Sequence, residues 1–377
     1  MTTQSDYEAR LHGVRALMHM HGLDFLVVGP SADMVYLTGA HTRPSERLAA
    51  VILPQLGPGY FVTPAFEAAS LPEMPEGTQV KTWGETDNPS ALAANIIADS
   101  LHGQPGGLNC TIGVGERLWS VFLLRLQAEL PRASFTPATA VLSAARQIKT
   151  AGEVAAMQKA GAASDDAFAE FVGKQFTGKS ELELSAMFAD LLKARGVQIG
   201  DPPLVASGPN SASPHHHSGE RVIQQGDAIV LDFWGIVDDY TFDCTRIVFA
   251  GGVPAPGSEQ AKVYEIVAKA QEAAVQAVRP GMTCEALDQV AREIITEAGY
   301  GEYFSHRLGH GIGLDTHEAP YIVEGNDTAL QDGMSFSIEP GIYLPGKFGV
   351  RVEDCVAMVD GKAVRLNNAD HGIISVR

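Results

Sequence analysis

The chain has 377 residues, of which 45% are hydrophobic and 19% charged, a composition typical of a globular protein that is long enough for two domains. Acidic residues outnumber basic ones by 45 to 27, so the surface is expected to repel nucleic acid and anionic membranes. The four cysteines form no Cys-x-x-Cys pair, and neither an export signal nor an apolar run of membrane-spanning length is recognised, which indicates a cytoplasmic protein with reduced cysteines.

The first part of the chain alternates predicted helices with short apolar strands. Residues 6–22 have apolar side chains at helical spacing, and Phe25–Gly29 follows as a buried strand. Further elements are expected as strands at 49–53, 60–62 and 111–114 and as helices at 89–101 and 118–130. We predict a mixed α/β domain over residues 1–145 and a second domain over residues 146–377.

The second domain contains a weak internal repeat of paired helices. Long helices are predicted over residues 152–172 and 259–278, and a shorter helix between two glycines follows each of them, at 178–196 and at 281–299. A serine or threonine stands two positions after the first glycine in both cases and can cap the helix. Chance similarity is the alternative. The repeat is favoured because acidic strand residues follow both helix pairs, which predicts a site at the junction of the two halves.

Two apolar strands after the first helix pair each carry one aspartate. Asp232 lies in the strand Ala228–Gly235 and Asp243 in the strand Tyr240–Phe249, and a turn between the strands would bring the two side chains together. A carboxylate in so apolar a strand requires a cation or a hydrogen-bonding partner. Arg246 is the alternative partner, and neither interpretation is favoured for either aspartate alone.

A glycine-rich segment follows the second helix pair. It places three glycines around His310, which allows close backbone approach, and it carries His317 seven residues later. Its Gly-x-Gly-x-Gly run is a weak phosphate-loop signal because no lysine and no helix follow. Metal ligation or proton transfer explains the two histidines better.

Two more apolar strands are predicted at 334–343 and 349–358, and each contains one glutamate, Glu339 and Glu353. A salt bridge to Arg351 on the same strand is an alternative for Glu353 alone, but it does not account for Glu339 and the histidines. Four carboxylates and one imidazole suit two divalent cations about 3.5–4 Å apart, because anionic oxygens offset the repulsion between the cations. The metal set is therefore Asp232, Asp243, His310, Glu339 and Glu353.

These segments resemble those of the pita-bread metallopeptidases, the superfamily of methionine aminopeptidase, aminopeptidase P, prolidase and the metal-free creatinase. The resemblance runs from Gln147 to near the C-terminus, and a weaker one over residues 10–65 points to the branch of prolidase, aminopeptidase P and creatinase. It implies an α+β fold, with a C-terminal pita-bread domain of pseudo-two-fold repeat and a smaller creatinase-like N-terminal α/β domain. A metal-free amidinohydrolase is not expected, because the metal set is complete.

The resemblance also implies a role for each member of the metal set: Asp232 chelates one ion, His310 and Glu339 hold the other, and Asp243 and Glu353 bridge the two. The expected cofactor is two divalent ions per subunit, Mn, Co or Zn, because a carboxylate-rich site with one histidine accepts any of them. The implied reaction is attack on the scissile carbonyl by a bridging hydroxide, with Glu339 as proton shuttle.

Two further histidines are implied in handling the peptide. The segment Ser207–His215 resembles one that ends in a substrate-binding histidine in this family, which selects His215 from the three histidines at 215–217. His317 is expected to stabilise the tetrahedral intermediate and to contact the substrate.

Prolidase and aminopeptidase P both cleave before proline, but only a dipeptidase must recognise a free carboxylate on that proline. Prolidases commonly use an arginine just beyond the His-Glu-x-Pro motif, and Tyr321 begins that region here. We expect Arg43 or Arg47 to reach the site from the partner subunit of a homodimer, and Tyr321 and Arg351 to be further substrate contacts.

The compact length favours an Xaa-Pro dipeptidase (prolidase), whereas the missing arginine favours the alternative, an Xaa-Pro aminopeptidase (aminopeptidase P) that acts on longer peptides. A non-catalytic binding protein on the same fold stays open as a different class, because fold does not fix function.

Overall fold

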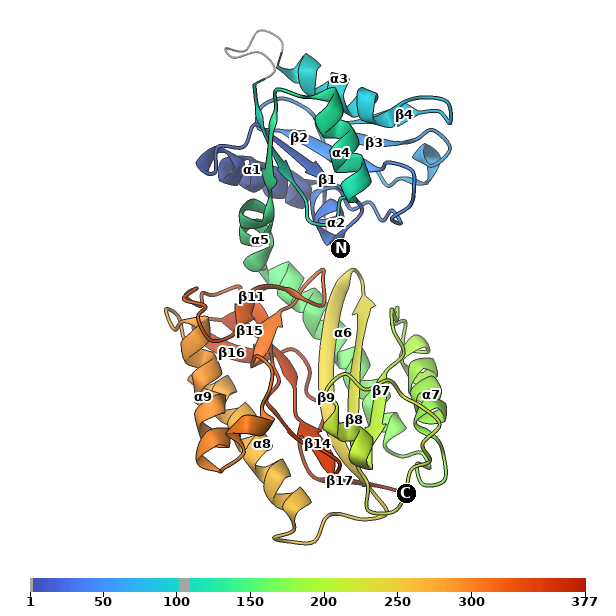
Figure 1. Cartoon of the computed structure of the whole chain (residues 1–377), viewed down its shortest axis with the longest axis vertical. Coiled ribbons are helices and arrows are strands. Elements are labelled where there is room, and N and C mark those ends of the chain that lie inside the picture. The colour runs from blue at the N-terminus through green and yellow to red at the C-terminus, as the bar shows by residue number, and fades with distance from the viewer. Residues whose placement is uncertain (1–2, 102–108) are drawn as a thin grey trace. The chain divides into compact units, whose positions relative to one another are not determined.

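The computed structural model describes residues 3–101 and 109–377, and the chain divides into two compact units, Met1–Arg146 and Gln147–Arg377 (Figure 1). The first unit is built on a mixed sheet with the strand order β4-β3-β2-β1-β5-β6. Its strands are β1 (Phe25–Val28), β2 (Ala50–Pro54), β3 (Gly59–Pro64), β4 (Thr78–Trp83), β5 (Thr111–Val114) and β6 (Ser134–Pro137). The central strand β1 pairs antiparallel with β2 and parallel with β5.

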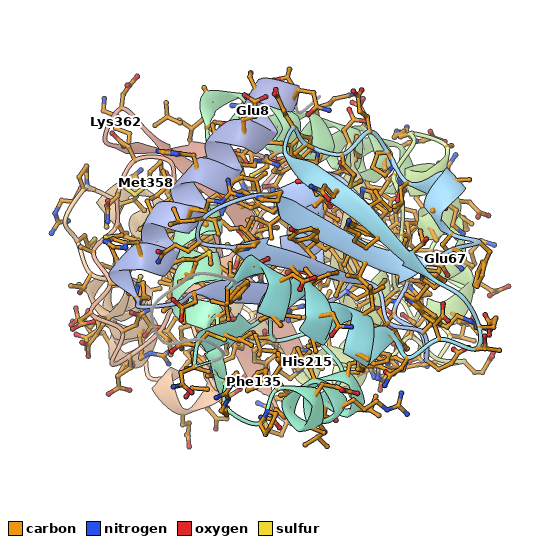
Figure 2. The ribbon with its side chains drawn as sticks, turned by 90° about the horizontal axis from the view of Figure 1, so that it is seen from above. Glu8, Glu67, Phe135, His215, Met358 and Lys362 are labelled. Atoms are coloured by element: carbon orange, nitrogen blue, oxygen red, sulfur yellow. The ribbon has the colours of Figure 1, made fainter. Side chains whose placement is uncertain are left out.

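Helices cover both sides of this sheet, with α1 on one side and α3 and α4 on the other (Figure 2). The helices of this unit are α1 (Gln4–Met20), α2 (Ala32–Thr38), α3 (Pro89–Ser100), α4 (Ser120–Glu129) and α5 (Thr139–Gln147). The helices and strands predicted here are confirmed to within two residues at each end. The exposed edge strands β4 and β6 and the short helices α2 and α5 were not predicted, because each spans only a few residues, which gives little room for an apolar pattern to show.

The second unit contains the two predicted helix pairs, and these helices match the predicted ranges closely. They are α6 (Ala151–Phe171) with α7 (Glu181–Lys193), and α8 (Glu259–Ala277) with α9 (Cys284–Glu297). Ser180 caps α7 in a capping box with Glu183, and Thr283 caps α9. The repeat of helix pairs is therefore present in the fold.

The two helix pairs pack on the strands of the second unit around two separate hydrophobic cores. The core of the first half contains Phe168 of α6, Phe188 of α7 and Phe233 of β8, and the Phe188 and Phe233 rings lie 4.6 Å apart between centroids. The core of the second half joins α8 and α9 to the strands around Phe336. This second core also contains Phe249 of β9, whose ring centroid lies 6.1 Å from that of Tyr264 on α8, so it draws on strands from both halves. Burial of each phenylalanine stabilises the fold by about 1.5–3 kcal/mol.

The strands of the second unit form two sheets and a separate hairpin. The four-stranded sheet, in the order β17-β9-β8-β7, contains β7 (Leu204–Ser207), β8 (Ala228–Val237), β9 (Tyr240–Ala250) and β17 (Ile374–Val376). The five-stranded sheet, in the order β11-β10-β12-β15-β16, contains β10 (Gly309–Gly311), β11 (Glu318–Ile322), β12 (Ser335–Ile338), β15 (Asp354–Val359) and β16 (Lys362–Arg365). The hairpin consists of β13 (Gly341–Leu344) and β14 (Phe348–Arg351).

Short 3-10 helices at Ala68–Ser70, Gly208–Ala212 and Gly301–Tyr303 complete the elements of the described chain. All four cysteines are free and buried. Within residues 3–101 and 109–377, no helix combines the length and the apolar character that crossing a membrane requires.

Candidate metal centre

The hairpin of β8 and β9 brings the two aspartates of the metal set together, as predicted. Asp238 and Asp239 have positive φ angles of 49° and 73° in the turn, a backbone conformation that suits a tight hairpin. The register places Asp232 opposite Thr245 and Asp243 opposite Trp234. Residues two apart on a strand share a face, so Asp232 and Asp243 are diagonal neighbours on one face of the sheet.

Glu339 and Glu353 lie between strands, not within them. The strands predicted at 334–343 and 349–358 are each broken in two: β12 pairs with β15 in the five-stranded sheet, whereas β13 pairs with β14 in the separate hairpin. Pro340 cannot donate a ladder hydrogen bond. The Glu339 amide donates instead to Leu308 O at 2.8 Å, and the Glu353 amide donates to Thr245 O at 3.1 Å. This change of partners corrects the prediction and places both glutamates where the paired strands diverge.

His310 lies in β10, which two glycines allow to pass between its neighbours. A Cβ on Gly309 would lie 1.9 Å from Ser337 O, and one on Gly311 would lie 2.3 Å from Ala319 O. The His310 Nδ1 donates to Gly311 O at 3.1 Å, since a carbonyl can only accept. Burial first, and then the neighbouring His317, lower the pKa of His310 to about 3. The ring is therefore neutral at pH 7, and its Nε2 carries the free lone pair that a metal ligand needs.

The five members of the metal set converge at one place. Their ligand atoms form three overlapping groups, each within 4.8 Å: Asp232, Asp243 and Glu353; His310, Glu339 and Glu353; and Asp243, His310 and His317. The His310 Nε2 lies 3.3 Å from Glu339 Oε1 and 3.9 Å from Asp243 Oδ2. The cluster draws on both halves of the unit, because β8 and β9 supply the aspartates and the second half supplies the rest.

Several carboxylates in a buried cluster carry strong mutual repulsion. Burial first, and then Asp232 and Glu339, raise the pKa of Asp243 well above its usual range. Burial, Asp243 and Glu339 do the same to the pKa of Glu353, and burial raises the pKa of Glu339 to about 7. Divalent cations would remove this repulsion, and carboxylates with one neutral imidazole are suitable ligands for them. The residues therefore fit a metal centre.

Arg351 does not form the alternative salt bridge with Glu353. Arg351 is only 4% exposed, and its guanidinium Nη2 lies 2.6 Å from Asp232 Oδ2 in an ion pair. It also donates to the Tyr343 hydroxyl at 2.8 Å and from Nε to Thr245 Oγ1 at 3.0 Å. Thr245 in turn donates to Glu353 Oε2 at 2.7 Å. Direct substrate contact by Arg351 stays a prediction, and its observed contacts orient Asp232.

The other alternative, an ion pair between Arg246 and the aspartates, is wrong. Arg246 lies on β9 and pairs with Asp354, Nη2 to Oδ1 at 2.7 Å. Alternation explains this result, because Arg246 stands an odd number of residues from Asp243 and so faces the opposite side of the strand.

The two predicted substrate histidines lie near the cluster and are exposed. The His317 ring meets the His310 ring edge to face, with centroids 4.1 Å apart. The His215 charge acts on His317 and lowers its pKa, after burial and Arg307. His216 is bound elsewhere, since its Nε2 lies 2.8 Å from Glu181 Oε2. His215, labelled in Figure 2, is therefore better placed than His216 to meet a ligand.

Arg307 is a neighbour of the cluster that sequence reasoning missed. Its guanidinium stacks on the Tyr321 ring at 4.4 Å from the centroid, and Tyr321 is 39% exposed. Its positive charge acts to lower the pKa of Glu339, His310 and His317. The available signal was its position three residues before His310 in the glycine-rich segment.

The two arginines proposed to bind a substrate carboxylate belong to the first unit. Arg47 forms ion pairs with Glu46 and, from Nε to Oε1 at 2.9 Å, with Glu85. Arg43 is exposed. Their reach into a partner's site stays a prediction.

Comparisons with known proteins place the chain in a family. The sequence model of metallopeptidase family M24 matches residues 155–360, and that of the creatinase/prolidase N-terminal domain matches residues 10–148. The chain belongs to metallopeptidase family M24. Its relatives include the probable dipeptidase PepE of Mycobacterium tuberculosis, 38% identical over 98% of this chain and 96% of that one. The Xaa-Pro dipeptidase of Lactobacillus helveticus is 35% identical over 94% and 96%.

Solved structures of similar proteins share the whole architecture of this M24 peptidase. A prolidase from Thermococcus sibiricus has a TM-score of 0.90 at 40% identity, covering 98% of this chain and 99% of that one. An X-Pro aminopeptidase from Thermotoga maritima has a TM-score of 0.81 at 29% identity, covering 96% and 100%. The predicted fold, a creatinase-like domain before a pita-bread domain, is confirmed, and family membership implies divalent metal binding.

Proposed function

We propose that this M24 peptidase is an Xaa-Pro dipeptidase that hydrolyses the peptide bond before proline with two divalent ions, Mn, Co or Zn, held by the metal set. The observation that carries the proposal is the convergence of four carboxylates and one neutral imidazole in a buried cluster. The chain also matches the Xaa-Pro dipeptidase of Lactobacillus helveticus at 35% identity and the Thermococcus sibiricus prolidase at 40%, each over 94% of this chain or more, against 29% identity to the X-Pro aminopeptidase. We further propose a cytoplasmic homodimer.

When bound, the two ions lower the pKa of a water molecule and polarise the scissile carbonyl. Glu339 is suited to accept and return a proton, because its carboxylate lies within the cluster, 3.3 Å from His310 Nε2, where an activated water would be bound. His317 stands at the exposed side of the cluster, where its N–H can donate to the developing oxyanion. The Arg351 guanidinium donates a hydrogen bond to the Asp232 carboxylate, and the Thr245 hydroxyl donates one to the Glu353 carboxylate. Both carboxylates therefore keep fixed positions during turnover.

The proposal is tested by stripping the protein with a chelator, restoring Mn, Co or Zn in turn, and assaying three substrates: an Xaa-Pro dipeptide, an Xaa-Pro-Xaa tripeptide and an Xaa-Ala dipeptide. Metal-dependent cleavage of the Xaa-Pro dipeptide alone is the expected result. Cleavage of the tripeptide would favour aminopeptidase P. The lack of an arginine after the His-Glu-x-Pro motif is the sequence feature that supports this alternative. No cleavage with any metal would favour a non-catalytic binding protein.

We propose Arg307 as the group that binds the free carboxylate of the dipeptide. Stacking on Tyr321 uses the face of the guanidinium, so its N–H groups in the plane can form the paired hydrogen bonds that a carboxylate accepts. Arg307 also lies close enough to act on the charges of Glu339 and His317. A carboxylate bound there would place the proline bond beside the cluster.

The Arg307→Ala variant is expected to raise KM for the dipeptide by about 10- to 100-fold, the effect of losing a charged hydrogen bond, while tripeptide cleavage changes little. The matched variants are Arg43→Ala and Arg47→Ala, which test the proposed contribution of a partner subunit. Loss of dipeptide cleavage in either would support that contribution and argue against Arg307. An unchanged dipeptide KM in all three variants would show that none of these arginines binds the free carboxylate of the dipeptide.

A further inference from the structure

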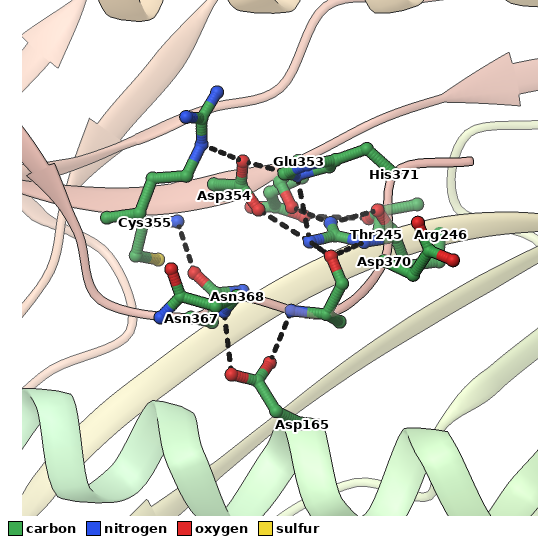
Figure 3. A network of polar contacts seen from close by, with 12 residues as sticks. Asp165, Thr245, Arg246, Glu353, Asp354, Cys355, Asn367, Asn368, Asp370 and His371 are labelled. Atoms are coloured by element: carbon green, nitrogen blue, oxygen red, sulfur yellow. Dashed lines mark hydrogen bonds and ion pairs between the residues drawn. The ribbon is translucent and has the colours of Figure 1, made fainter.

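Figure 3 shows a buried ion pair between Arg246 and Asp354. Arg246 stands opposite Leu231 in the β8–β9 register, so it lies on the face of the sheet opposite to Asp232 and Asp243. Arg246 is 2% exposed and Asp354 is fully buried, and the pair joins β9 to the first residue of β15. Asp354 directly follows Glu353 in the chain.

Four of the six hydrogen bonds of Arg246 within the described residues go to main-chain carbonyls, and two of these carbonyls belong to Glu353 and to Thr245. Nη1 donates to Glu353 O at 2.5 Å and to Thr245 O at 3.0 Å. Thr245 is the residue whose hydroxyl donates to the Glu353 carboxylate. Arg246 therefore holds the backbone of a proposed ligand and also the backbone of the residue that orients that ligand's side chain.

A second set of hydrogen bonds joins the Arg246 guanidinium to the segment Asn367–His371. Nη2 and Nε donate to Ala369 O at 2.9 Å and 3.3 Å. The segment is itself tied to helix α6, because the Asp165 carboxylate accepts from the amides of Asn368 at 2.6 Å and Ala369 at 2.8 Å (Figure 3).

Asn367 extends this support to the second proposed bridging ligand. Its Nδ2 donates to Asp243 O at 3.3 Å, and its Oδ1 accepts from the Cys355 amide at 2.9 Å. The Cys355 thiol also donates to Asp243 O at 3.3 Å. One short segment thus holds the backbones of both Asp243 and Glu353, directly in one case and through Arg246 in the other.

An ion pair needed only for stability would not require this arrangement. Replacing a buried ion pair by apolar residues is often neutral or stabilising, so its retention calls for another reason. Ligands that bridge two cations must keep their separation, and outer residues that fix such ligands commonly affect metal affinity about 10- to 100-fold.

We propose that Arg246 and Asn367 are positioning residues, which hold Glu353 and Asp243 at the separation that two cations require. This inference rests on the proposed metal centre. It assigns a role in metal affinity to two residues that cannot touch the metal or the substrate.

The test measures the affinity of chelator-stripped full-length protein for Mn²⁺, by competition with a chromophoric chelator. Arg246→Lys, Arg246→Met and Asn367→Ala are expected to bind Mn²⁺ about 10- to 100-fold more weakly than the unchanged protein. Arg246→Lys keeps the charge beside Asp354 but loses the forked donors, so it separates positioning from charge balance. At saturating Mn²⁺ the KM for the dipeptide should stay unchanged.

Arg365→Met is the matched control. Arg365 pairs with the other oxygen of Asp354, Nε to Oδ2 at 2.9 Å, and with Glu272 at the surface, and neither partner belongs to the metal set. Its Mn²⁺ affinity should equal that of the unchanged protein, while melting temperatures without metal report stability for every variant. Equal Mn²⁺ affinity in folded Arg246→Lys and Asn367→Ala would overturn the inference. Absence of Mn²⁺, Co²⁺ and Zn²⁺ binding by the unchanged protein would instead overturn the metal centre itself.

Discussion

Glu339→Gln is expected to lower kcat for an Xaa-Pro dipeptide by about 10²- to 10⁴-fold, the range that loss of a positioned proton acceptor commonly gives. Glutamine has a similar shape but cannot take a proton at neutral pH. It can still accept the hydrogen bond that Ser337 Oγ donates to Glu339 Oε1 at 3.0 Å. The measurement is steady-state kinetics at saturating metal, combined with the metal content of the purified variant.

Metal content separates the two roles proposed for Glu339. Full metal occupancy with low kcat would indicate lost proton transfer, whereas lower occupancy would indicate lost ligation. Glu302→Gln, at an exposed position of the same unit, is the control and should leave both quantities unchanged. A kcat for Glu339→Gln within about threefold of the original would contradict the role assigned to this residue.

In the metal-free protein, the contribution of Glu339 to the unfolding free energy is expected to fall as pH rises from about 4.5 to about 7. Glu339 has a pKa of about 7 in the folded chain against an ordinary value of 4.5, so the folded state holds a proton that the unfolded state has lost in this window. Protonation therefore stabilises the metal-free fold at the low end of the window, and this stabilisation disappears above pH 7. The shift corresponds to about 3 kcal/mol from Glu339 alone.

The pKa values of Asp243 and Glu353 are raised as well, so they act in the same direction, whereas the pKa of His310, lowered from 6.5 to about 3, acts in the opposite direction below about pH 6.5. Bound metal should reverse the trend, because cations bind the ionised carboxylates and stabilise the fold by about 3–4 kcal/mol at saturating concentration. Urea unfolding at pH 5 and pH 8, with chelator and with Mn²⁺, measures both effects. Without metal, the unfolding free energy of the Glu339→Gln variant should fall less, or rise more, between pH 5 and pH 8 than that of the unchanged protein. The same change with pH in both proteins would disprove this account.

Local patterns predicted the elements that carry the aspartates well. The apolar runs around Asp232 and Asp243 are long, and the turn between them is short, so a hairpin was the simplest outcome. The contents of the cluster followed from the cost of leaving carboxylates unpaired in such strands. The helix pairs could be predicted equally well, because glycines and capping residues mark the ends of the helices.

Long-range partners could not be predicted from local patterns. Arg351 pairs with Asp232, 119 residues away in the chain, and not with Glu353 two positions later. The strand breaks at Glu339 and Glu353 depend on which neighbour each half-strand pairs with, and an apolar run looks the same in one sheet or in two. The role of Arg246 also required the register of β9, which fixes the face to which its side chain points.

The metal set takes its residues from both halves of the second unit. In an unfolded chain none of these five residues lie together. In a chain in which only the first helix pair and its strands have folded, Asp232 and Asp243 lie together, but His310 and both glutamates have not yet been brought beside them. Such a partial site lacks the ligands to retain an ion tightly. During biosynthesis the protein should therefore acquire its metal late, after the halves have joined, and an immature molecule would stay inactive towards peptides around it.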